Sequence, residues 1–231
     1  MAVQRWDIGE VTVHCVQETV TPSPPEVAVD GVDAELLEAH GHWLRPRYVT
    51  DDGLLLIAFQ SFLVESQGVR IVVDTCFGND RRYQGMEPLH TSYLDDLAAL
   101  GFGREEVDVV LCTHLHLDHV GWNTMLVDDT WVPTFPDARY LFAAEEHRFW
   151  EGRRSPFVRY RDTIDPVVAA GLHQLVASDH QITPEVRLVP TPGHTPGHVS
   201  VRIASAGAAA LISGDILHHP CLLYTSPSPR D

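Results

Sequence analysis

The sequence of 231 residues has no apolar run long enough to cross a membrane. Its longest purely apolar segment, residues 54–59, is far shorter than the roughly 20 residues that a membrane-spanning helix needs. The first 15 residues, MAVQRWDIGEVTVHC, contain no apolar core of the kind found in signal peptides. We therefore expect a cytoplasmic protein with no membrane partner.

Positive charge is also scarce. The chain has 16 Lys and Arg residues against 32 Asp and Glu residues, so its formal net charge is −16. Binding to a phosphate backbone or to an anionic membrane surface requires clustered cations. The charge balance thus argues against nucleic acid as a partner and favours a small-molecule substrate; it does not indicate an oligomeric state.

Cysteine is rare too. The four cysteines are Cys15, Cys76, Cys112 and Cys221, and no two of them form a CxxC pair. This pattern excludes a dense disulfide framework and favours reduced thiols. Cys112 lies in an apolar run, where a buried thiol acts as a small hydrophobic side chain.

Strand-like and helix-like segments alternate along the chain, which predicts an α/β layered architecture. We expect strands at residues 10–18, 54–65, 69–74, 107–112, 138–142, 186–191, 198–203 and 208–213, and helices at residues 91–100, 143–150 and 163–176. Gln67-Gly68 is expected to form a tight turn, and Thr91 or Ser92 to cap the first helix. The stretch 20–53, which contains several prolines, is predicted to be an extended arm or lid.

Histidine is the abundant residue, with 14 copies. His114, His116, Asp118 and His119 lie within six positions directly after an apolar strand. Imidazole and carboxylate groups are the ligands that Zn²⁺ and similar ions prefer. In an extended segment His114 and His116 project to the same side, because the side-chain period of a strand is two.

Two further strand ends carry residues of the same kind. His194 lies in the segment PGHTPGH, and Asp215 in SGD after the apolar run AAALI. Each of the two residues alone is equally explained as a turn residue. Together with the HxHxDH segment, they predict a metal site built at one edge of a layered fold.

At these motifs the chain resembles the metallo-β-lactamase superfamily, over about residues 55 to 220. The resemblance implies an αβ/βα four-layer sandwich and two Zn²⁺ ions, with iron or manganese as other metals. By that resemblance His114, His116 and His194 hold the first ion. Asp118 and His119 belong to the second ion, and Asp215 bridges both.

The last ligand of that family, a C-terminal histidine on the second metal, has no match here. Residues 221–231, CLLYTSPSPRD, read like a sequencing adapter translated in frame. We therefore expect residues 1–220 to form an incomplete domain without its last strand and helix, followed by a non-native tail. His218 and His219 are better explained as residues that line the pocket or contact the ligands than as replacement ligands, and His198 as a residue that contacts a ligand or stabilises a turn. Asp74 either orients a ligand histidine or is an aspartate of the turn at the strand end.

The resemblance implies a hydrolase in which a hydroxide from the dinuclear site opens a small ester or lactone, while Asp118 carries a proton. The segments QSFLVE, THLHLDHVGWN and FPDARYLF are most similar to the branch of acyl-homoserine lactonases and methyl-parathion hydrolase-like enzymes. A glyoxalase II-like thioesterase is the alternative. A second alternative is a di-iron redox protein of this fold, although such proteins commonly have Glu where this chain has His116. The third alternative is an inactive truncated chain.

Apolar walls for the substrate are expected from the segment Val120-Gly121-Trp122-Asn123 and from Trp43, Leu44 and Tyr48. Core packing is the alternative for each aromatic residue. The remaining histidines are interpreted as ordinary surface or core residues; they are His14, His40, His42, His90, His147, His173 and His180.

Overall fold

The computed structural model describes residues 3–29, 31–83, 87–153 and 155–219. The chain divides into two compact units, one formed by Met1–Glu18 and Phe59–Gly214, the other by Thr19–Ala58 and Asp215–Asp231. The expected non-native tail, residues 221–231, lies outside the described residues. Among the described residues, no helix has the length and apolar character needed to span a bilayer.

A seven-stranded sheet forms the centre of the first unit, in the order β1-β2-β3-β4-β5-β8-β9. Its strands are β1 (Gln4–Ile8), β2 (Val11–Ser23), β3 (Leu55–Ser66), β4 (Val69–Val73), β5 (Val109–Leu111), β8 (Arg139–Ala143) and β9 (His173–Val176). The pairs β4–β5, β5–β8 and β8–β9 are parallel, whereas β1–β2 and β3–β4 are antiparallel. The carboxyl ends of β4, β5 and β8 therefore meet at one edge of the sheet.

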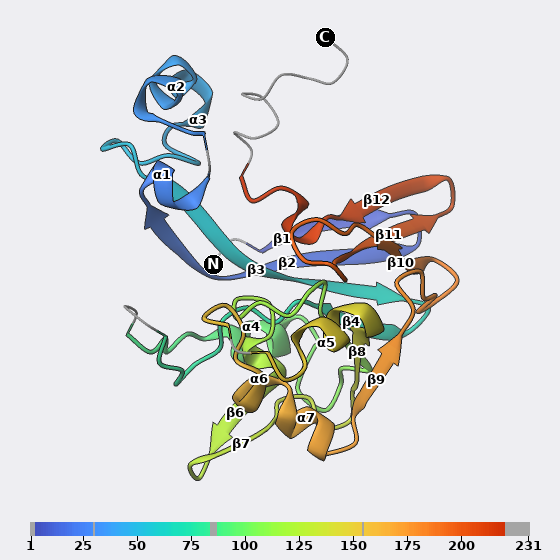
Figure 1. The fold of residues 1–231 in the computed structure, drawn as a ribbon. Coiled ribbons are helices and arrows are strands. Elements are labelled where there is room, and N and C mark those ends of the chain that lie inside the picture. Colours follow the sequence, from blue (N-terminus) through green and yellow to red (C-terminus); the bar gives the residue numbers. More distant parts are fainter. Residues whose placement is uncertain (1–2, 30, 84–86, 154, 220–231) are drawn as a thin grey trace. The chain divides into compact units, whose positions relative to one another are not determined.

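The two faces of this sheet pack against different layers of the fold (Figure 1). Val110 packs with residues of α4 (Tyr93–Ala99) and α7 (Asp165–Ala169). Its neighbours Val109 and Leu111 pack instead with β10 (Val186–Pro190), β11 (Val199–Ser205) and β12 (Ala208–Ile212), which form a three-stranded antiparallel sheet. This alternation follows from the two-residue side-chain period of a strand and confirms the layered α/β sandwich.

Most of the predicted strands are confirmed with bounds that differ by a few residues, and the helix expected at 143–150 is α5 (Ala144–Trp150). Gln67 and Gly68 have φ values of 53° and 78°, so they form the expected tight turn between β3 and β4. Ser92 is the N-cap residue of α4, but it does not cap the backbone. Its hydroxyl donates to the Asp96 carboxylate at 2.9 Å instead.

The prediction of one helix over residues 163–176 is wrong. The chain forms α6 (Tyr160–Thr163) and α7, after which Gly171 adopts a φ of 71° and ends the helical segment. Residues His173–Val176 then pair with β8 as strand β9. Tertiary pairing with the sheet outweighs the weak helical pattern there, as it commonly does for short segments.

The prediction of an extended arm at residues 20–53 is wrong, because this stretch of the second unit forms three short helices. After β2 the chain forms α1 (Pro25–Ala28), α2 (Ala34–Ala39) and α3 (Gly41–Leu44), and the Asp33 side chain caps α2 through the Leu36 amide. A separate hydrophobic cluster supports these helices; it comprises Val29, Val32, Leu37, Leu44, Val49 and Leu55, with Trp43 and Tyr48 packed against it. Leu44, Trp43 and Tyr48 thus contribute to a core, as the alternative interpretation held.

The sequence interpretation did not include β1 or the hairpin of β6 (Thr124–Val127) and β7 (Thr130–Pro133). Asp128 and Asp129 connect the hairpin with φ values of 47° and 61°. Aspartate tolerates this left-handed region better than most residues do, so the Asp-Asp pair was a usable turn signal.

Gly121 begins the 3-10 helix η1 (Gly121–Asn123), directly after the histidine-rich segment. Its amide donates to the Cys76 carbonyl at 2.7 Å. A Cβ atom at this position would lie 1.8 Å from the Phe77 carbonyl oxygen, so only glycine permits this approach of two backbone segments.

The Gly121→Ala substitution is expected to lower the free energy of unfolding by about 3 kcal/mol, because backbone atoms must separate to admit the methyl group. Gly103→Ala is the control, since a Cβ there meets only the end of the Glu106 side chain. Urea unfolding of both variants measures the difference. Equal stability of the two variants would contradict the proposed close contact.

Candidate metal centre

The histidine-rich segment follows β5 at the carboxyl edge of the sheet. His114 is completely buried, whereas His116, Asp118 and His119 are partly exposed. The His119 amide donates to the His116 carbonyl at 3.0 Å, so the segment turns after Leu117 as its sequence predicted. Polar ligands thus lie at the surface end of a buried strand, where a small molecule can reach them.

Three histidines from two loops form one compact group. The ring centroids of His114 and His116 are 4.6 Å apart, those of His114 and His194 are 4.8 Å apart, and those of His116 and His194 are 4.7 Å apart. One ring nitrogen from each lies within 4.8 Å of the others. The structure therefore brings together the three residues that the resemblance assigned to the first ion.

Asp74 anchors the segment from the neighbouring strand end. It directly follows β4, has a φ of 57°, and accepts hydrogen bonds from the Thr113 amide at 2.7 Å and the Thr113 hydroxyl at 2.8 Å. Its Oδ2 also lies 2.9 Å from Nδ1 of His119. A neutral His119 that donates from Nδ1 keeps the lone pair on Nε2, which lies 3.5 Å from the Asp118 carboxylate.

Glu146, which the sequence interpretation did not single out, joins the two histidine-bearing loops. Its side chain is 1% exposed. Oε1 accepts from the Leu115 amide at 3.1 Å and the Trp150 indole at 2.7 Å. Oε2 accepts from the Thr195 hydroxyl at 2.7 Å and the Gly197 amide at 3.0 Å. A glutamate at the third position of a short helix gives no such signal in sequence, because its contacts with Leu115, Thr195 and Gly197 are non-local.

His198 has a buried position rather than an exposed one. It is 1% exposed, and its Nδ1 lies 2.8 Å from the Thr191 hydroxyl. The close neighbour of the His198 ring is Gly214, where a Cβ would lie 2.6 Å from Nε2. These contacts fit both a ligand-contacting and a turn-stabilising residue, so the role of His198 stays a prediction.

Asp215 directly follows Gly214 and is the first residue of this part of the second unit. There its carboxylate lies 3.1 Å from Nε2 of His218. His219 lies 3.0 Å from the Tyr48 carbonyl, and burial lowers its pKa. His219 therefore has a structural contact in its own unit, and the bridging role of Asp215 stays a prediction.

The apolar surroundings of the histidines differ from those expected. Trp122 is buried, stacks on Tyr93 at 5.4 Å, and donates to the Glu18 carboxylate at 2.6 Å, so it is a core residue. Two other aromatic rings lie next to His116 instead: Trp150 at 5.6 Å and Phe157 at 5.9 Å. Phe157 follows the short helix α5 in a segment without regular structure, which is why pattern analysis missed it.

The fold and the histidine group together define a metallo-hydrolase-like architecture, and comparison with known proteins identifies the family. The family model of the Metallo-beta-lactamase superfamily matches residues 60–230. The chain belongs to this superfamily, as its motifs predicted.

Two relatives found by sequence comparison are only distantly related to this chain. An N-acyl homoserine lactonase of Bacillus sp is 25% identical over 169 residues, covering 67% of this chain and 62% of the relative. The chain thus spans less than two thirds of that protein's length. An uncharacterized protein of Bacillus subtilis, YobT, is 32% identical over 111 residues, which is 46% of this chain and 44% of YobT.

Solved structures share the fold at low identity. A probable metal-dependent hydrolase from Staphylococcus aureus has a TM-score of 0.74 and 19% identity, covering 91% of this chain and 75% of that one. A dizinc quorum-quenching lactonase solved with its product has a TM-score of 0.70 and 19% identity, covering 90% and 72%. These matches confirm the fold class.

Replacing Glu146 with Gln should destabilise the protein by about 3 kcal/mol, because the new amide group places a donor opposite two existing donors. Glu145→Gln is the matched control, since Glu145 is exposed on the same helix. Chemical unfolding measures stability, and competition with a zinc chelator measures metal affinity. If Glu146→Gln matched the control in both measurements, Glu146 would not hold the two loops.

Proposed function

We propose that this protein is a dinuclear metal hydrolase that opens a small ester or lactone. The observation that carries the proposal is the group of His114, His116 and His194, whose ring nitrogens converge from two loops at the carboxyl edge of the sheet. Membership of the superfamily and the lactonases among its relatives support the reaction class.

The residues fit a divalent metal by their donor chemistry. Neutral imidazole is a preferred ligand of Zn²⁺, and three protein ligands are the usual set for a catalytic ion. We assign His114, His116 and His194 to the first ion, Asp118 and His119 to the second, and Asp215 to both. Iron or manganese would suit the same donors. When bound, two such ions supply a water whose pKa is low enough to give hydroxide at neutral pH.

Asp118 is the residue that we expect to move a proton. Its side chain is 23% exposed, and Oδ2 lies 3.5 Å from Nε2 of His119, so the carboxylate is accessible without being fully solvated. Hydrolysis forms a bond from the water oxygen to the carbonyl carbon and breaks the bond to the leaving oxygen. Asp118 accepts the proton of the water at Oδ2 and returns it to that leaving oxygen.

Trp150 and Phe157 supply an apolar surface beside His116. Phe157 is 61% exposed, so its ring is accessible to a ligand. A substrate with an acyl or alkyl chain would bury this surface while its carbonyl group lies at the histidines. A thioester presents the same carbonyl group, so the glyoxalase II-like alternative is tested alongside.

The cellular location that we propose is the cytoplasm. Cys15, Cys76 and Cys112 are free thiols in the interior, and burial raises the pKa of Cys15 to about 11. Such thiols suit a reducing compartment, where no disulfide is required for stability.

The proposal is tested with the full chain loaded with Zn²⁺ and offered an acyl-homoserine lactone, an aryl ester and a thioester. His116→Ala should lower kcat/KM by about 100-fold or more and lower the bound zinc, because a ligand of the first ion is lost. His42→Ala, at an exposed position in the second unit, is the matched control and should change neither value.

Hydrolysis of the lactone or the aryl ester with high kcat/KM supports the proposal. A preference for the thioester would replace it with the glyoxalase II-like function. Full activity in the His116→Ala variant would contradict the role of the histidine group.

A further inference from the structure

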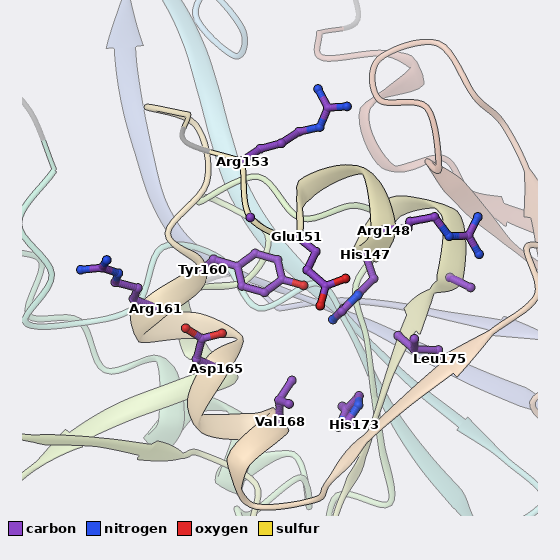
Figure 2. A pocket seen from close by; sticks show the side chains of 12 residues that line it. His147, Arg148, Glu151, Arg153, Tyr160, Arg161, Asp165, Val168, His173 and Leu175 are labelled. Carbon is purple, nitrogen blue, oxygen red and sulfur yellow. The ribbon is translucent and has the colours of Figure 1, made fainter.

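A cavity of about 840 Å³ lies between α5, the α6–α7 segment and β9, apart from the candidate metal centre (Figure 2). All of its lining residues belong to the first unit. His147, Tyr160 and His173 contribute polar groups to it, and Val168 and Leu175 contribute apolar surface. The sequence had indicated only ordinary histidines at positions 147 and 173.

The polar groups of this cavity have unused hydrogen-bonding capacity. Nδ1 of His173 and the hydroxyl of Tyr160 are buried without a hydrogen-bond partner in the described part of the chain. His147 is 8% exposed, and among the described residues its ring makes no side-chain hydrogen bond. Its ring centroid lies 5.6 Å from that of Tyr160 and 6.4 Å from that of His173. Buried polar groups are rarely left unsatisfied, so a cluster of them points to a ligand.

The polar groups that line the cavity include acceptors on Glu151 and Asp165, groups on Tyr160 and the two histidines that can donate or accept, and the guanidinium donors of three arginines. Burial lowers the pKa of His147, and a neutral imidazole offers one donor and one lone pair. The pKa of Tyr160 is raised by burial first, and then by the negative charges of Glu151 and Asp165. The charges of Glu151 and Asp165 therefore reach the Tyr160 hydroxyl in the cavity lining.

Among the described residues, none of the three arginines that line the cavity forms an ion pair with Glu151 or Asp165. The Arg153 guanidinium lies over the Phe149 ring, 4.2 Å from its centroid. Arg148 and Arg161 are exposed, and Figure 2 shows their guanidinium groups directed away from Tyr160 and Glu151. Glu151 and Asp165 are exposed as well, and with Tyr160 and the two histidines they offer a ligand in the cavity two carboxylates, a phenol and two imidazoles.

We propose that this cavity binds a small organic cation, namely a primary ammonium group on a short alkyl chain. The ammonium group has three hydrogen-bond donors and no acceptor, which complements Glu151, Asp165 and the unpartnered polar atoms. The alkyl chain lies against Val168 and Leu175. An anion would instead need hydrogen-bond donors, and the guanidinium groups of Arg148 and Arg161 are directed away from Tyr160.

The test is titration calorimetry of the zinc-loaded full chain with n-pentylammonium chloride, 1-pentanol and inorganic phosphate. We expect saturable binding of pentylammonium only. Glu151→Gln should weaken it about tenfold and Tyr160→Phe by a smaller factor, because each variant removes one contact to the ammonium group. Glu145→Gln is the charge-matched control on α5 and should bind as the unmodified chain does.

Nuclear magnetic resonance of ¹⁵N-labelled histidine places the ligand. Shifts of the His147 and His173 signals with pentylammonium, at unchanged signals of His114 and His116, support the proposed cavity. The proposal is overturned by absent binding, by equal binding of 1-pentanol, by preference for phosphate, or by equal affinity of the Glu151→Gln and Glu145→Gln variants.

Discussion

The candidate metal centre depends on the hydrogen bonds that the Glu146 carboxylate accepts. This carboxylate is almost fully buried and accepts hydrogen bonds from both loops that carry the histidines. Without it, Leu115 and Gly197 would each leave a backbone amide without this acceptor in a dry environment. The distance between His116 and His194 is therefore set by a residue that touches neither ring. These hydrogen bonds account for a carboxyl side chain in the interior of the first unit.

A second constraint acts at the ends of the parallel strands. Asp74 at the end of β4 holds Thr113 at the end of β5, and it also orients His119. The close approach of Gly121 to Phe77 then fixes where the chain leaves the histidine-rich segment. Strand pairing, a buried carboxylate and a glycine contact thus position the same loop from three sides. Preorganised ligands of this kind bind a metal without a large cost in conformational entropy.

Sequence reasoning succeeded where the signal is local. The HxHxDH segment predicted a group that includes His114 and His116, and the structure adds His194 to it as expected. Alternating apolar residues located most strands of both sheets. Helix α5 was predicted, but the contacts of Glu146 and the cavity beside His147 were not, because both involve segments other than the helix itself. Residues 20–53 and 173–176 were wrongly interpreted because their structure depends on tertiary packing rather than on local pattern.

The central claim is that His114, His116 and His194 hold a catalytic metal ion. Anomalous diffraction at the zinc absorption edge, from crystals of the full chain grown with Zn²⁺, tests it most directly. The account predicts a strong peak at about 2.0–2.1 Å from one ring nitrogen of each histidine. A peak elsewhere in the chain, or no peak near these three rings, would contradict it.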